Sequence, residues 1–196
     1  MREPILSILI CTIPEREAQF NKLLDHLRSQ QTEEVEIIWS NTPRGKDMPV
    51  GKKRQTLIDR AFGDYVVFID DDDWVSDDYV SSILQAAKEA PDCIGLRINV
   101  TGIKGEQHAA ASNRYNRWKS NSQGFDYVRT IYHKTPVKRE HALAIGYKPM
   151  HFGEDYDYSR RLKASGLLKK EVFIDKELYF YRFKFEEPKK KYGIEA

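Results

Sequence analysis

The stretch YVVFIDDDD at residues 65–73 decides how this chain is read, because an apolar run of strand length ends at four consecutive aspartates, Asp70 to Asp73. Adjacent carboxylates repel one another and stay ionised only when cations or many hydrogen-bond donors compensate them. The aspartates would also lie just beyond the carboxyl end of a strand, where open α/β sheets place their ligands. We therefore expect a metal-binding site here rather than a solvated acidic loop.

Strands and helices alternate around this stretch. The near-continuous apolar run at 5–11 is typical of a buried parallel strand, and apolar residues spaced i, i+3, i+4, i+7 over 20–27 predict a helix after it. The further elements expected in this half are a strand at 35–39, a helix around 57–61, a helix at 76–87 with Ser76 as its N-cap, and a strand at 93–100. This order predicts an α/β fold with a doubly wound sheet, in a single compact domain over 1–196.

The pattern changes beyond residue 100. Residues 105–124 are polar, poor in aliphatic side chains and without clear periodicity, which favours a lid-like functional loop. The elements expected after it are a strand at 127–133, a short helix at 138–145 and a strand at 178–185.

Composition restricts the class of protein further. A chain of 196 residues with 40% hydrophobic residues is long enough for one domain with a full core. Its apolar stretches are far shorter than the roughly 20 residues that span a bilayer, and its first residues lack a leader-like apolar core, so we expect a cytoplasmic protein without a membrane span. Cys11 and Cys93 fall inside apolar runs and are expected to be core residues.

Charge is distributed unevenly although the formal net charge is only +2. Basic residues gather at 52–54, 114–119, 138–139 and 189–191, which suits an anionic substrate held through a metal. The run at 189–191 is more typical of a solvated basic end, and a nucleic-acid contact there stays open.

Two known aspartate motifs can be compared with 70–73. An EF-hand loop needs an oxygen ligand at its fifth position and glycine at its sixth, but counting from Asp70 these are Trp74 and Val75, so this motif is excluded. A haloacid-dehalogenase-type phosphatase also begins with a strand and Asp-x-Asp, yet it expects Thr or Val where this chain has Trp74. It remains the weaker alternative.

A longer match points elsewhere. Residues 50–74, from Val50 through Lys52-Lys53-Arg54 to the aspartates and Trp74, resemble the core of family 2 glycosyltransferases of the GT-A fold, and GEDYDYSRRL at 153–162 resembles the Glu-Asp motif of that family. The resemblance implies a GT-A-like mixed sheet whose residues 1–100 bind the nucleotide sugar and whose residues 101–196 bind the acceptor. It also implies an inverting transferase that moves a sugar from a nucleotide-diphosphate donor to an acceptor hydroxyl.

The chemistry of such a donor calls for a divalent metal. Mn²⁺ or Mg²⁺ that bridges the diphosphate to a carboxylate neutralises the charge of the leaving group, and Asp72 is the expected ligand. By resemblance Asp70 would face the ribose and Asp73 would support the site, with the register uncertain by one residue. The full set of expected donor contacts is Thr12, Pro14, Arg16, Asn41, Arg54, Gln55, Asp70 and Asp71.

A second carboxylate must take the proton from the acceptor hydroxyl. The Glu-Asp match assigns this base to Asp155, with Glu154 orienting it or holding the acceptor. Expected contacts to the acceptor or the diphosphate are Trp118, His151 and Arg182. The histidines His133 and His141 follow no motif, and such residues are more often structural than functional.

The sequence does not identify the acceptor, and it allows a saccharide, a protein or a modified nucleobase. Two other classes also remain, a metal-dependent phosphoryl-transfer enzyme and a non-catalytic module that binds sugar nucleotides or glycans.

Overall fold

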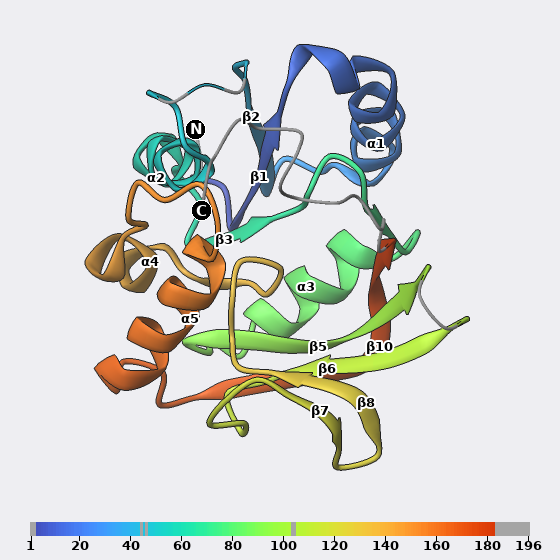
Figure 1. Cartoon of the computed structure of the whole chain (residues 1–196), viewed down its shortest axis with the longest axis vertical. Helices are drawn as coiled ribbons and strands as arrows, with labels where there is room; N and C mark the ends of the chain where they lie inside the picture. The colour runs from blue at the N-terminus through green and yellow to red at the C-terminus, as the bar shows by residue number, and fades with distance from the viewer. Residues whose placement is uncertain (1–2, 44, 46, 103–104, 183–196) are drawn as a thin grey trace, which may run out of the picture.

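A computed structural model describes residues 3–43, 45, 47–102 and 105–182 (Figure 1). Within them the strands are β1 (Leu6–Thr12), β2 (Val35–Asn41), β3 (Tyr65–Phe68), β4 (Trp74–Val75), β5 (Cys93–Thr101), β6 (Gln107–Ala111), β7 (Lys119–Ser122), β8 (Phe125–Arg129), β9 (Val137–Lys138) and β10 (Glu171–Arg182). The helices are the 3₁₀ turn η1 (Pro14–Arg16), α1 (Glu17–Gln30), α2 (Val50–Arg60), α3 (Tyr79–Ala87), α4 (Arg139–Ile145) and α5 (Glu154–Ser165).

The described strands form one mixed sheet in the order β2-β1-β3-β9-β5-β6-β8-β7, and β10 pairs with β5 and β4. Strand β1 is parallel to both β2 and β3, and β10 is parallel to β5, whereas β9 runs antiparallel to β3 and β5. The expected α/β fold with a mixed sheet is confirmed.

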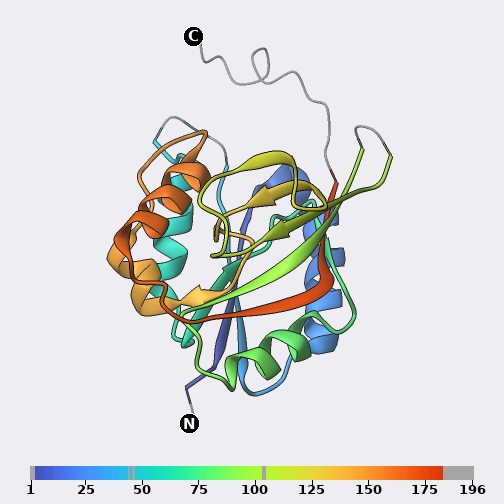
Figure 2. The same cartoon turned by 90° about the horizontal axis from the view of Figure 1, so that it is seen from below.

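Helices cover both faces of the sheet, as Figures 1 and 2 show: α1 and α3 lie on one face, and α2, α4 and α5 lie on the other. Alternate side chains of β1 pack into the hydrophobic cores on the two faces of the sheet. Ile8 packs with the apolar side chains of α1 and α3, whereas its neighbour Leu9 packs with Leu57 of α2 and Leu162 of α5. Burial on both faces explains why the first strand reads as an almost unbroken apolar run. Cys11 and Cys93 are free thiols within these layers, as expected.

The segment expected as a lid-like loop, 105–124, contains two strands, β6 and β7, that the sequence interpretation did not predict. Residues 109–111 are three buried alanines of β6 that lie between β5 and β8, so small side chains conceal the pattern of a central strand. Strand β7 is a polar edge strand joined to β8 by a tight turn in which Gln123 and Gly124 both have positive φ, of 54° and 80°.

Other boundaries also differ from the prediction. Helix α3 begins at Tyr79 with Asp78 at the N-cap, because the Asp78 carbonyl accepts from the Ser82 amide at 2.9 Å, whereas the Ser76 carbonyl accepts from the Tyr79 amide in a tighter turn. Strand β8 ends at Arg129, since Thr135 Oγ1 bonds to both the amide and the carbonyl of Tyr132 and folds the chain into a turn.

The last strand begins earlier than expected, at Glu171. Residues 183–185 of the predicted strand and the basic run at 189–191 lie outside the described residues. No helix within the described part of the chain has the length and apolarity to cross a bilayer.

Candidate functional site

The site forms where β1, β2 and β3 end along one edge of the sheet. The register pairs Thr12, the last residue of β1, with Asn41, the last residue of β2, and Leu9 with Phe68 near the end of β3. The four aspartates follow β3 directly, and the Asp73 amide bonds back to the Asp70 carbonyl at 3.1 Å. This tight turn sends the four carboxylates toward different partners.

Asp71 and Asp72 face the segment after β1. Asp71 is buried and accepts hydrogen bonds from Thr12 Oγ1 at 2.9 Å and from Arg16 Nη1 at 2.7 Å. The same Arg16 nitrogen lies 3.1 Å from Asp72, whose side chain is 20% exposed. Burial raises the pKa of Asp71, although Arg16 and Thr12 oppose the shift. Thr12, Arg16, Asp71 and Asp72, all expected site residues, thus lie next to one another, and their roles stay predictions. Pro14 begins the 3₁₀ turn that carries Arg16.

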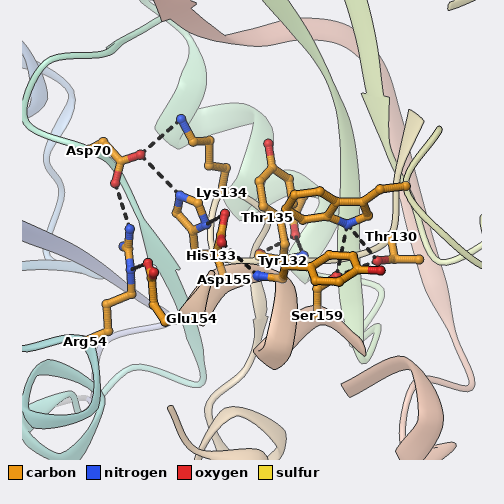
Figure 3. A network of polar contacts seen from close by, with 12 residues as sticks. Arg54, Asp70, Thr130, Tyr132, His133, Lys134, Thr135, Glu154, Asp155 and Ser159 are labelled. Carbon is orange, nitrogen blue, oxygen red and sulfur yellow. Dashed lines mark hydrogen bonds and ion pairs between the residues drawn. The ribbon is translucent and has the colours of Figure 1, made fainter. Parts of the chain in front are cut away.

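Asp70 is the hub of the network in Figure 3. Its carboxylate lies 3.0 Å from Arg54 Nη2, 3.1 Å from Lys134 Nζ and 3.2 Å from His133 Nε2. Burial opposes ionisation, but the charges of Lys134, His133 and Arg54 outweigh it and hold the pKa of Asp70 well below its usual range. Asp70 is therefore an anion at neutral pH.

Asp73 points to the opposite side, toward β10. Its side chain is fully buried and accepts from Lys134 Nζ at 2.5 Å, from the Tyr179 hydroxyl at 2.7 Å and from the Arg182 amide at 3.3 Å. Burial raises the pKa of Asp73 to about 6 even though Lys134 works in the other direction. Lys134 thus bridges two aspartates, and their negative charges raise its own pKa against the effect of burial.

These contacts bear on the expected metal. Among the described residues, no group of three or more His, Cys, Asp or Glu side chains is arranged to hold a metal ion. Asp70, Asp71 and Asp73 are compensated by Arg54, Lys134 and Arg16, and the partly exposed Asp72 lies 3.1 Å from the same Arg16 nitrogen that pairs with Asp71. A single carboxylate suits Mg²⁺ or Mn²⁺ whose remaining ligands are phosphate oxygens and water, and it does not suit an all-protein cage.

The predicted base lies at the start of α5, which begins after Gly153 in a left-handed conformation with φ of 72°. Glu154 is buried and accepts from Arg54 Nε at 3.2 Å, so Arg54 connects it to Asp70. Asp155 is 27% exposed, and its Oδ2 lies 3.7 Å from Nδ1 of His133. The carboxylates of the two predicted motifs are therefore separated by one imidazole ring.

Aromatic side chains flank Asp155. Trp118 donates from Nε1 to Thr130 Oγ1 at 3.2 Å, and its ring meets those of Tyr132 and Tyr156 edge-on at 5.4 and 5.2 Å. His151 is exposed in the loop before α5. Arg182 is exposed at the end of β10, where its backbone reaches Asp73.

Two expected donor contacts lie apart from this network. Gln55 donates to Asp59 of the same helix at 2.7 Å, and it accepts from the Tyr147 amide at 2.6 Å, a contact that joins α2 to the segment after α4. Asn41 is exposed at the end of β2, beside Thr12. Their roles as donor contacts stay predictions.

The sequence did not single out Lys134 or Tyr179, and it gave His133 no role. All three are buried at the aspartates. Their only signal is local: His133 ends an expected strand, Lys134 follows it, and Tyr179 alternates with other aromatic residues near the chain end. Neither pattern shows that the residue meets a carboxylate more than 60 positions away, as Lys134 and His133 do at |i−j| of 61 and 63.

The fold and this edge-of-sheet cluster of aspartates define a class of α/β proteins with a nucleotide-type ligand site. The model of the glycosyl transferase family 2 matches residues 42–151, more than half of the chain, and the chain belongs to this family. Residues 70–73, together with Lys134, fall inside the match.

Relatives of known name agree with the family. EpsH of Bacillus subtilis (strain 168), which is named as a glycosyltransferase, is 26% identical over 116 residues, which are 48% of this chain and 33% of EpsH. A crystal structure of S. aureus TarS superposes with a TM-score of 0.66 at 15% identity, covering 91% of this chain and 36% of TarS. TarS 1–349 in complex with UDP-GlcNAc superposes with a TM-score of 0.62 at 13% identity, covering 93% and 59%. These likenesses confirm a GT-A-like fold, and the chain spans about a third of the length of EpsH and of the longer TarS chain.

Proposed function

We propose that this chain is the catalytic domain of an inverting glycosyltransferase that moves a sugar from a nucleoside-diphosphate donor to an acceptor hydroxyl. Family membership and the GT-A-like fold support a glycosyltransferase over a phosphoryl-transfer enzyme. The observation that carries the proposal is the arrangement of carboxylates. Asp72 lies with its neighbours at the carboxyl edge of the sheet, and the partly exposed Asp155 reaches the same network through His133 (Figure 3).

The donor half of the site is lined by cations as well as carboxylates. Arg16 lies against Asp71 and Asp72 at the end of β1, and the partly exposed Asp72 offers the carboxylate for a metal-bound diphosphate. Bound Mn²⁺ or Mg²⁺ would neutralise charge that grows on the departing diphosphate. Asp72 would hold the ion, while Asp70 and Asp73 keep the surrounding turn in place through Arg54, Lys134 and Tyr179.

Asp155 acts as the general base in this proposal. It takes the proton of the acceptor hydroxyl as that oxygen attacks the anomeric carbon, and the bond to the diphosphate oxygen breaks with its electron pair leaving on the nucleotide. Attack opposite the leaving group inverts the configuration of the sugar. Glu154 is buried against Arg54, so its role here is to fix the start of α5 and hence the position of Asp155.

The first donor to test is a uridine-diphosphate sugar, since TarS has been crystallised with UDP-GlcNAc and with UDP. Calorimetry would compare UDP, GDP, CDP and their common sugar conjugates, each with Mn²⁺ and with EDTA, on wild type and Asp72→Ala. We expect one nucleotide class to bind with metal and to lose about tenfold or more in affinity in the variant. Binding that is equal in both proteins would contradict the role of Asp72.

Turnover separates an enzyme from a binding module. Release of nucleoside diphosphate from the donor that binds would be followed with water and with a panel of saccharides as acceptors. Asp155→Asn should retain donor affinity and lose turnover by at least 100-fold, since a positioned base contributes factors of this order. The matched control is Asp157→Asn, one turn into the same helix, where the carboxylate pairs with Lys148 and Arg161. Equal losses in both variants would remove Asp155 from the mechanism.

A further inference from the structure

His133 occupies the position between the donor-side carboxylate and the predicted base, and its backbone is fixed there. The Phe68 amide of β3 donates to the His133 carbonyl at 2.8 Å, which brings the imidazole beside Asp70 at the end of the same strand. The ring is buried, with 4% of its side chain exposed, and it meets the Tyr132 ring edge-on at 4.9 Å. A burial of this kind leaves the ring few orientations.

The two ring nitrogens have different surroundings. Nε2 lies within hydrogen-bond distance of Asp70, at 3.2 Å. Nδ1 is buried and has no hydrogen-bond partner among the described residues, and it faces Asp155 Oδ2 at 3.7 Å (Figure 3). A buried polar nitrogen without a partner is rare in folded proteins and calls for an explanation.

The charges around the ring determine where its proton sits. The Asp70 carboxylate is ion-paired with Arg54 at 3.0 Å and Lys134 at 3.1 Å and so acts as an acceptor, which favours a hydrogen on the His133 Nε2 that lies 3.2 Å away. Burial and the nearby charge of Arg54 lower the pKa of His133 despite Asp70 and Asp155, so the ring is neutral near pH 7. A neutral ring protonated on Nε2 leaves an acceptor lone pair on Nδ1, directed at Asp155.

We propose that His133 is a positioning residue for the base, whose Nδ1 accepts a hydrogen bond from Asp155 once Asp155 has taken the proton of the acceptor hydroxyl. The inference rests on the proposed function. Before proton transfer the Nδ1 lone pair faces the carboxylate of Asp155, and the repulsion between them disfavours the ionised form of that side chain. After transfer the new Oδ2–H bond donates to Nδ1, the proton stays on Asp155, and His133 keeps its own proton on Nε2.

In this proposal the hydrogen bond to Nδ1 keeps the transferred proton on Asp155 and holds that carboxyl group in place. Among residues that the structure describes, the other titratable groups that face Asp155 from the elements packed against it are the phenols of Tyr132 and Tyr147, which burial keeps neutral. Glu154, on its own helix, is directed to Arg54. His133 is thus the partner that distinguishes the two protonation states of Asp155.

The test needs neither donor nor acceptor. Carbon-13 carboxyl NMR on the whole chain, with the Asp155 signal assigned by its loss in Asp155→Asn, gives the titration midpoint of that side chain. In His133→Gln the amide can reach Asp70 but leaves no acceptor at the place of Nδ1, so the midpoint should fall by about one pH unit, the value of one hydrogen bond. In His133→Asn the side-chain oxygen can take the place of Nδ1, and the midpoint should stay close to that of wild type.

Nitrogen-15 NMR of His133 in wild type tests the same idea without a substitution, should a variant fail to fold. The expected result between pH 6 and 8 is a neutral ring with hydrogen on Nε2. Hydrogen on Nδ1, a charged ring, or an Asp155 midpoint that is unchanged in His133→Gln would overturn the inference. An Asp155→Asn enzyme with full turnover would instead overturn the proposed function, so the two failures are distinguishable.

Discussion

Replacing Lys134 by methionine tests whether this buried lysine compensates the aspartates in place of bulk water. Methionine keeps most of the apolar stem beside Tyr179 and Tyr181, whose ring centroids lie 4.6 and 4.0 Å from Nζ. It removes the ion pairs of 2.5 Å to Asp73 and 3.1 Å to Asp70. Asp70 is 28% exposed and keeps other partners, so most of the loss falls on the fully buried Asp73. Leaving a buried charge without its partner costs about 3–5 kcal/mol, and we expect about 3 kcal/mol at pH 8.

The loss should depend on pH in a defined direction. The pKa of Asp73 is already raised to about 6, above its value in the unfolded chain, and removal of the lysine raises it further. A carboxyl group with a raised pKa in the folded state loses stability as pH rises from the unfolded value to the folded one. In the variant this loss continues above pH 6, so the difference from wild type is larger at pH 8 than at pH 5.

Urea unfolding at pH 5 and pH 8 would measure both quantities. The matched control is Lys176→Met, which breaks a pair of the same 2.5 Å length to Asp78, but one in which both side chains are exposed. An exposed pair contributes about 0–1 kcal/mol. If Lys134→Met cost no more than the control at pH 8, or lost the same amount at both pH values, the reasoning on buried compensation would be refuted.

Two further predictions concern the frame that holds the site. In Gly51→Ala the new Cβ would lie 1.9 Å from the Lys148 carbonyl oxygen, so we expect a loss of more than about 2 kcal/mol in unfolding free energy, against little change in Gly45→Ala, where nothing lies within 4 Å. Equal melting temperatures for the two variants would refute this. Burial opposes ionisation of Asp92, but hydrogen bonds from nearby backbone amides and side chains outweigh it and lower its pKa; stability from this group is therefore present above its unfolded pKa and is lost as pH falls. Asp92→Asn should destabilise the chain at pH 7, and the loss should shrink only well below the unfolded pKa, so that urea unfolding shows a smaller loss at pH 2 than at pH 7, whereas Asp175→Asn, at an exposed pair, should show little change at either pH.

The sequence predicted the fold of residues 1–100 well because each element there carries its own periodic signal. Leu23 and Leu27 mark the inner face of α1, and the run before Asp70 marks β3, and both are buried as expected. The strand β6 escaped prediction because its identity depends on what lies beside it. Ala109 to Ala111 show no alternation of their own and become a strand only through pairing with β5 and β8.

The site was predicted in the same uneven way. Runs of acidic residues such as Asp70 to Asp73 are visible in a sequence, so the carboxylates were found. The residues that compensate them are scattered: Lys134 and Tyr179 reach Asp73 over separations of 61 and 106 residues. Contacts of that kind are set by how β9, β10 and the 130–136 turn pack, which no local pattern encodes. The sequence interpretation therefore assigned too much of the negative charge of the four aspartates to compensation by a metal.

Arg54 has a consequence for how far the two halves of this chain can be treated as modules. Its guanidinium joins Asp70 of the first half to Glu154 of the second, across 100 residues, at a side-chain exposure of 5%. Consider a chimera that combines residues 1–100 of this chain with the second half of a relative that has no acid at the place of Glu154. In it the buried Nε–H of Arg54 would lose its acceptor. Exchange of the second half among relatives is therefore constrained by a residue of the first half, and Arg54 and Glu154 have to be transferred as a pair.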